Sequence, residues 1–139
     1  MVLEILETHP LPAHVDRELL AACVDACADC NSTCTVCADA SVAESDVVEL
    51  RRCIRLCLDC ADVCVVTGRA LARQTDYEHE TAKAMLEACV RACGICAQEC
   101  ERHAHMHEHC RLCAQVCRRC EAACSRLLDK AQPVRGAQS

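Results

Sequence analysis

Cysteine is the residue of this sequence most able to do chemistry, and its spacing is regular. Eighteen of the 139 residues are cysteines, in four groups within which steps of four and three residues alternate. This alternation places each group on one face of an α-helix, at the positions that Leu or Ile occupies in a helical bundle. The groups are Cys23, Cys27, Cys30, Cys34 and Cys37; Cys53, Cys57, Cys60 and Cys64; Cys89, Cys93, Cys96 and Cys100; and Cys110, Cys113, Cys117, Cys120 and Cys124. The sequence therefore predicts four thiol stripes that converge on one interior.

We expect these thiols to be free of disulfide bonds and to have a role beyond packing of the core. Cβ atoms four residues apart on a helix are ~5 to 6 Å from each other, beyond the ~3.8 Å that a disulfide prefers. Packing alone would favour Leu or Ile, which bury more apolar area at each site than Cys does. Binding of thiophilic metal ions is therefore the leading hypothesis for all eighteen residues.

Charge and reach favour Cu(I), with many ions in each protomer. Zinc prefers closed tetrahedra of four ligands, and each tetrathiolate site would add a charge of about −2 to a core poor in water. A Cu(I) ion is soft, and one that displaces a thiol proton leaves the net charge unchanged. A linear S–Cu–S unit spans about 4.5 Å if the Cu–S bond resembles the ~2.3 Å Zn–S bond, which pairs such as Cys23/Cys27 can supply. Zinc or another thiophilic metal, iron–sulfur binding and thiol redox chemistry remain as alternatives.

Four long helices are needed to carry the stripes. The motifs Ser41-x-x-Glu44 and Thr75-x-x-Glu78 are typical of capping boxes, which start helices. No proline lies between residues 12 and 133, so we expect helices over residues 13–40, 42–73, 76–103 and 107–130. Similar lengths and short connections predict an all-α fold: an antiparallel up-down-up-down four-helix bundle with a cysteine-lined core.

The expected domain organisation is simple. Residues 1–12 are an N-terminal segment able to form a short helix, residues 13–131 are the copper-binding bundle, and residues 132–139 are a flexible C-terminal tail. The third connection has neither Gly nor Pro and depends on the run from His103 to His109, so one continuous helix is the alternative there. Gly68 and Gly94 lie inside expected helices, and the pattern gives them no role.

One end of the bundle is expected to admit copper and the other to be closed. Beyond the cysteines at the histidine-rich end, the stripes continue mostly into ligand types: Ser41, Asp46, Leu50, His103, Met106 and His107. At the opposite end they continue into Leu19, Leu20, Val66, Thr67, Met85, Leu86, Leu127 and Leu128. We predict that His103, His107 and Met106 are further metal ligands at a mouth that passes ions to Cys37, Cys53, Cys100 and Cys110. The alternating His105 and His109 are expected to face solvent.

The composition excludes several classes of function. The formal net charge is −6 and the aromatic residues amount to one Tyr, which removes the basic surface and stacking platforms of nucleic-acid-binding proteins. No run approaches the ~20 apolar residues of a membrane span. The N-terminus has neither a basic n-region nor a twin-arginine pair, so we expect the reducing cytoplasm, where thiols stay free.

The four stripes over residues 13–130 and the histidine-rich turn before Cys110 resemble the bacterial copper storage protein family, in its cytosolic branch. The resemblance implies a four-helix bundle whose core cysteines hold many Cu(I) ions for storage or buffering. It further implies a cytoplasmic role in copper homeostasis, no enzymatic activity and a homotetramer. The copper donor and recipient proteins are not indicated by the sequence.

One feature of the sequence bears on assembly, and one alternative class of function remains open. The segment 42–73 carries apolar residues beyond its thiol stripe, among them Ile54, Leu56, Leu58, Val63, Val65 and Val66, which favours self-association through this helix. A thiol-based redox or metal-cluster enzyme is the hypothesis from another class. The two differ in stoichiometry, since a store binds on the order of one ion per thiol and an enzyme needs one or two sites.

Overall fold

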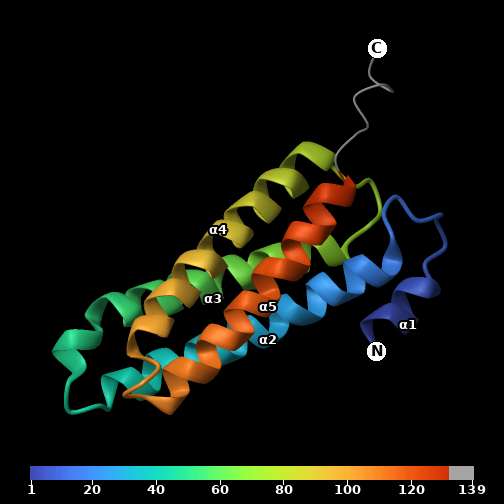
Figure 1. The fold of residues 1–139 in the computed structure, drawn as a ribbon. Coiled ribbons are helices and arrows are strands. Elements are labelled where there is room, and N and C mark those ends of the chain that lie inside the picture. Colours follow the sequence, from blue (N-terminus) through green and yellow to red (C-terminus); the bar gives the residue numbers. More distant parts are fainter. Residues whose placement is uncertain (132–139) are drawn as a thin grey trace.

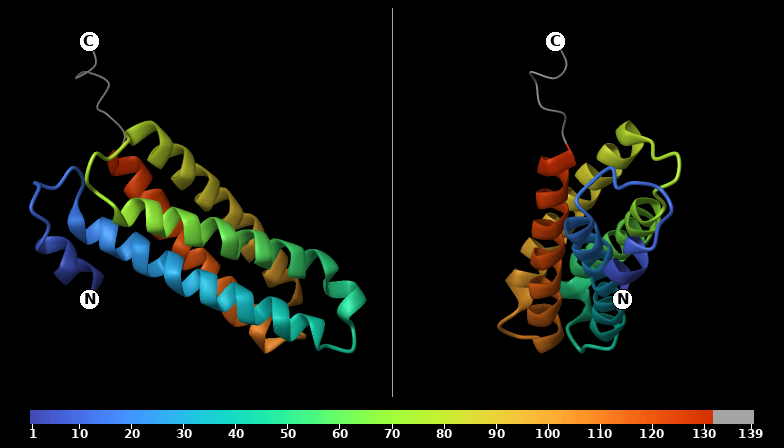
Figure 2. Two further views of the ribbon diagram at one scale, coloured as in Figure 1. Left: turned by 180° about the vertical axis from the view of Figure 1, so that it is seen from behind. Right: turned by 90° about the vertical axis from the view of Figure 1, so that its right-hand side faces the viewer.

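The computed structural model describes residues 1–131, and four long helices dominate it (Figure 1). Along the chain the elements are α1 (Val2–Glu7), α2 (Arg17–Val42), the short 3-10 helix η1 (Val47–Leu50), α3 (Arg51–Ala72), α4 (His79–His103) and α5 (Glu108–Ala131). Helices α2 and α4 each pack against both α3 and α5, with successive helices antiparallel (Figure 2). The predicted all-α four-helix bundle is confirmed. The predicted tail at residues 132–139 lies outside the described residues.

The helix starts differ from those that the capping boxes predicted. Asp16 caps α2 by accepting from the backbone N–H groups of Glu18 and Leu19, and Glu78 caps α4 in the same way. Ser41, predicted to start a helix, lies inside α2 and is fully buried. Its side chain is turned into the core as the next member of the thiol stripe, so it cannot cap a helix. The second long helix, α3, therefore begins at Arg51 and not near residue 42, and η1 occupies the connection.

The histidine-rich run does break the chain into two helices. Helix α4 ends at His103 and α5 begins at Glu108, which excludes the continuous helix. The backbone N–H of His107 donates to the carbonyl oxygen of His103 at 3.0 Å. This contact closes the turn without Gly or Pro.

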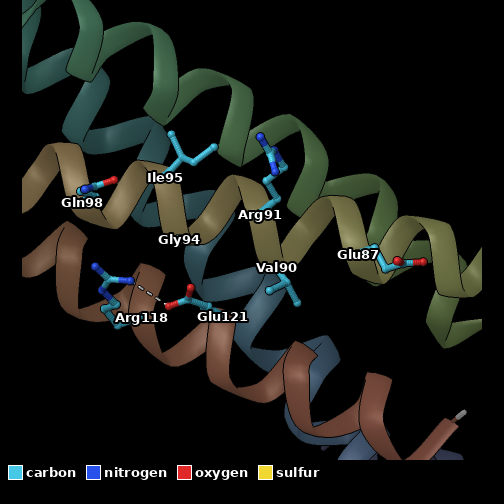
Figure 3. A pocket seen from close by; sticks show the side chains of 8 residues that line it. All are labelled: Glu87, Val90, Arg91, Gly94, Ile95, Gln98, Arg118 and Glu121. Atoms are coloured by element: carbon cyan, nitrogen blue, oxygen red, sulfur yellow. Dashed lines mark hydrogen bonds and ion pairs between the residues drawn. The ribbon is translucent and has the colours of Figure 1, made fainter.

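The two helical glycines mark close approaches between helices. A Cβ atom on Gly68 would lie 3.2 Å from the Cβ of Cys27, so this glycine lets α3 approach α2. A Cβ atom on Gly94 would lie 2.5 Å from a carboxylate oxygen of Glu121, which reaches from α5 across α4 (Figure 3). Both glycines thus make room for a residue of a neighbouring helix.

The short helix α1 lies beside the first part of α2, at the end of the bundle opposite the histidine-rich turn (Figure 2). Its Leu6 is buried against the bundle, whereas Ile5 is exposed. Within residues 1–131, no helix has both the length and the apolar character that crossing a bilayer requires.

Candidate metal centre

All eighteen cysteines lie in the interior with free thiols, and none exposes more than 1% of its surface. The four stripes of the sequence therefore face one another as predicted. The repeat explains this result, because alternating steps of four and three keep each stripe on the inner face of its helix.

The sulfur atoms form a connected network, which Cys37 and Cys110 join through the imidazole of His109. Across helices, Cys34 Sγ lies 3.5 Å from Cys117 Sγ, and Cys53 Sγ lies 3.7 Å from Cys100 Sγ. An unbroken series of sulfur contacts of 4.0 Å or less leads from Cys53 at the histidine end to Cys23 at the other end. Three sulfurs bound to one ion at ~2.3 Å would be about 4.0 Å apart. The network is thus preformed at metal-binding distances.

Groups of four thiols recur along the bundle, and they share members. In each group the four sulfur atoms lie within 4.8 Å of one another; examples are Cys27, Cys89, Cys120 and Cys124, then Cys30, Cys64, Cys93 and Cys120, then Cys30, Cys34, Cys60 and Cys117. Since Cys30 and Cys120 each belong to two of these groups, a bound ion shares thiolates with its neighbours. The geometry is that of a continuous cluster rather than of separate sites.

The surroundings of the thiols carry no compensating positive charge. Among the described residues, the buried polar or charged side chains are Ser41, Thr67, Gln74 and Glu99, so no Lys or Arg is buried. Divalent ions in tetrathiolate sites would leave excess negative charge in this core, at a high desolvation cost. Monovalent ions that each replace one proton would leave it neutral.

One end of the thiol network is closed by aliphatic side chains. Leu20, Leu71, Leu86 and Leu127 are almost completely buried beyond the last cysteines. Thr67, also buried, donates its hydroxyl to the carbonyl oxygen of Met85. Val66, which the stripe placed at this plug, is 52% exposed and lies outside it. A hydrogen bond with Cys124, 3.2 Å away, lowers the pKa of Cys23 to about 5.

At the histidine end, His109 is the imidazole that reaches the thiols. Its Nδ1 lies 3.4 Å from Cys37 Sγ and 3.6 Å from Cys110 Sγ, and its Nε2 lies 2.9 Å from a carboxylate oxygen of Glu44. Burial opposes protonation of His109, but the hydrogen bonds with Cys37 and Glu44 raise its pKa. A hydrogen bond with Cys37 raises the pKa of Cys110 to about 12. His109 with these two thiols forms a compact set of one nitrogen and two sulfur donors.

The histidines predicted as ligands are instead paired with carboxylates. His103 Nε2 lies 3.0 Å from Glu99. His107 lies 2.6 Å from Glu44 through Nδ1 and 3.0 Å from Asp46 through Nε2. The hydrogen bond with Asp46 raises the pKa of His107, and it lowers that of Asp46. These two residues therefore close the end of the bundle through their contacts with carboxylates.

Met106 and His109 of the turn differ in how far the structure bears on their predictions. Met106, predicted as a thioether ligand, is 67% exposed, and its role as a ligand stays a prediction. His109, expected to face solvent, contacts the thiols. A signal for His109 was present in the sequence: it lies four residues before Cys113, which on a helix places it beside the thiol stripe. His105 is exposed, as expected.

Comparison with known proteins identifies close relatives. The sequence profile of the family described as copper storage protein matches residues 16–129. The copper storage protein Ccsp from Streptomyces lividans, loaded with 10 copper equivalents, is 47% identical, with a TM-score of 0.92 over 94% of this chain and 99% of that one. The Cu(I)-bound copper storage protein BsCsp3 is 34% identical, with a TM-score of 0.70 over 79% of this chain and 98% of that one.

A further similar structure is a cytosolic copper storage protein from Streptomyces lividans carrying five coppers. It is 49% identical, with a TM-score of 0.80 over 81% of this chain and 93% of that one. Among curated proteins there is no match.

Proposed function

This chain belongs to the copper storage protein family, and from this premise we propose that it stores or buffers Cu(I), with many ions held on its core thiolates. The observation that carries the proposal is the connected network of eighteen buried thiols. An enzyme with one or two sites needs only a small part of such a network, whereas a store uses all of it.

The proposed ligands are the eighteen core cysteines, with His109 added at the histidine end. Cys37, Cys110 and His109 together can hold one ion through two sulfurs and a nitrogen, at the contacts of 3.4 and 3.6 Å between the imidazole and the thiols. His103 and His107 act in support, since they are held by Glu99, Glu44 and Asp46.

The charge of the core supports Cu(I) over a divalent metal. Each Cu(I) that binds releases one thiol proton, so the charge of the core does not change as it fills. With no Lys or Arg buried among the described residues, filling with Zn²⁺ would accumulate about −2 for each tetrathiolate site. Soft thiolate donors also favour Cu(I).

The cellular compartment that we propose is inferred from the same relatives. One similar structure is that of a cytosolic copper storage protein, and we place this protein in the cytoplasm, where its thiols stay reduced. Binding and release of copper need no catalytic step. We further propose a homotetramer in which α3 contributes an interface, since Leu58, Val65 and Val66 remain exposed on it in the single chain.

A titration tests the proposal. Reduced, metal-free protein is titrated anaerobically with Cu(I) against a chromophoric Cu(I) chelator, and a parallel titration uses Zn²⁺. We expect uptake of many Cu(I) ions, on the order of one per thiol, with two or three sulfur neighbours per ion in X-ray absorption at the copper edge. Saturation at one or two ions would refute storage, and Zn²⁺ uptake of equal extent and affinity would refute the selectivity for Cu(I).

A further inference from the structure

The end of the bundle with the histidine-rich turn is closed along the bundle axis. Leu50 and Ser41 are fully buried there. The side chains of His107 and Glu99 are only 9% and 7% exposed, and both are held in ion pairs. An ion approaching along the axis therefore meets buried side chains and paired charges before it meets a thiol.

The side of the bundle near this end offers a different path. A cavity of about 270 Å³ opens between α2 and α5, and it is lined by Ser32, Thr33, Val36, Cys37, His109 and Leu112. Its rim is exposed, because Val36 is 66% and Leu112 45% accessible. Its inner wall carries Cys37 and His109, the residues whose side chains meet at 3.4 Å. The cavity leads from solvent to the first soft ligands.

We propose that this lateral cavity is the port through which copper is loaded, and that it receives Cu(I) as the complex of a low-molecular-weight thiol. The inference rests on the proposed storage function and adds the place and the form in which copper arrives. Donor atoms decide the place: a larger cavity of about 570 Å³ between α4 and α5 (Figure 3) has no thiol, thioether or imidazole among its lining residues.

The size of the cavity supports a small carrier. Sites for drug-sized ligands measure about 300 to 1,000 Å³, so about 270 Å³ fits cysteine or the cysteinyl part of glutathione. A stable protein partner covers about 800 Å², whereas the exposed apolar rim here consists of Val36 and Leu112. The hydroxyls of Ser32 and Thr33 offer hydrogen bonds to the polar groups of such a carrier.

The transfer is a ligand exchange that balances without any oxidant. A bis-thiolate complex, [Cu(SR)₂]⁻, meets the thiol of Cys37; a Cu–S bond forms to Cys37, one Cu–SR bond breaks, and the thiol proton leaves with the departing RS⁻ as RSH. A second exchange with Cys110 releases the other carrier thiol in the same way. His109 lies against both sulfurs and can hold the ion between the two exchanges.

The proposed port is tested by substitutions that fill the lateral cavity with a Trp side chain. Ser32 and Leu112 are exposed, so Ser32→Trp and Leu112→Trp, made separately, block the cavity with little risk to the core. Met106→Trp adds the same bulk at the axial turn, and Val48→Trp adds it at another exposed site near this end. The probe is Cu(I)–glutathione mixed with reduced full-length protein. The measurements are the loading rate, the final copper content and the circular dichroism of each variant.

We expect both cavity variants to load at least tenfold more slowly than the wild type and to reach the same final content. Val48→Trp and Met106→Trp should load at the wild-type rate. Wild-type loading by folded Ser32→Trp and Leu112→Trp overturns the port, and so does a slow Met106→Trp beside fast cavity variants. Failure of the storage function itself is distinct, since it lowers the final content of the wild type.

Discussion

His109 Nδ1 lies 3.4 Å from the Sγ of Cys37, and this contact joins the turn after α4 to the thiol stripe of α2. The other imidazole nitrogen lies 2.9 Å from Glu44, so the ring is held in place from both sides. His107 stacks on it at 5.4 Å between ring centroids. The imidazole is thereby presented to the thiols in a fixed orientation before any ion arrives.

Replacing His109 should therefore affect transfer more than capacity. In His109→Ala we expect loading and chelator-driven removal to slow several-fold, while the final copper content falls by at most about one ion. His105→Ala is the matched control, because His105 lies on the same turn and is exposed. Stopped-flow transfer from Cu(I)–glutathione measures the rates. A His109→Ala variant that transfers copper as fast as His105→Ala would contradict this role.

The two helical glycines should respond in opposite directions to Ala. Gly→Ala inside a helix gains up to ~1 kcal/mol. At Gly68 the new Cβ meets the Cβ of Cys27 at 3.2 Å, and the overpacking costs ~1–3 kcal/mol, so we expect a net loss of up to about 2 kcal/mol. At Gly94 only the end of the Glu121 side chain must move, so Gly94→Ala should gain up to ~1 kcal/mol. Denaturant unfolding of the metal-free protein measures both, and equal effects would contradict the account.

The aliphatic plug should contribute stability and no transport. Leu86 is fully buried, so Leu86→Ala should lower the free energy of unfolding of the metal-free protein by ~2–5 kcal/mol. The loading rate should stay at the wild-type value, because copper arrives at the other end. Val48→Ala, at an exposed site of η1, should change stability by no more than about 0.5 kcal/mol. Faster loading in Leu86→Ala would show that copper enters through the leucine-lined end and would contradict the lateral port.

The ion pairs of His107 should make stability depend on pH. Because the pKa of His107 is raised, its contribution is complete below about pH 6.5 and is lost as the pH rises through the raised value. Because His107 lowers the pKa of Asp46, and His109 with His107 lowers that of Glu44, the contribution of these carboxylates is present above about pH 4.5 and is lost as the pH falls through the lowered values. The difference in Tm between wild type and His107→Gln, measured without metal, should thus be largest between about pH 4.5 and 6.5. A difference that grows above that range would contradict the ion pairs.

The fold could be predicted because one repeat encodes both the helices and the faces they bury. Steps of four and three over each group of cysteines leave a single way to hide eighteen thiols. The helix starts were harder, because a motif such as Ser41-x-x-Glu44 looks the same whether Ser41 caps a helix or continues a buried stripe. Only the packing of η1 and α3 against α2 decides between them.

The burial and convergence of the cysteines could be predicted, whereas the contacts of the histidine-rich turn could not. The stripes place thiols by periodicity, but residues 104–107 follow no helical period, so the position of the His107 ring depends on contacts with Glu44 and Asp46 from a distant part of the chain. Those carboxylates lie about sixty residues away in sequence. Local spacing carries no information about such contacts.

The unbroken series of sulfur contacts, closed by leucines at one end, sets the order in which copper is handled. Ions that move inward from Cys37 and Cys110 pass from thiolate to thiolate and come to rest toward Cys23 and Cys124. If loading follows the proposed lateral cavity, the ions deposited deepest leave only after those nearer the port have gone. The copper bound last, nearest the port, should therefore exchange quickly, and the copper bound first, near Cys23 and Cys124, should form a slowly exchanging reserve.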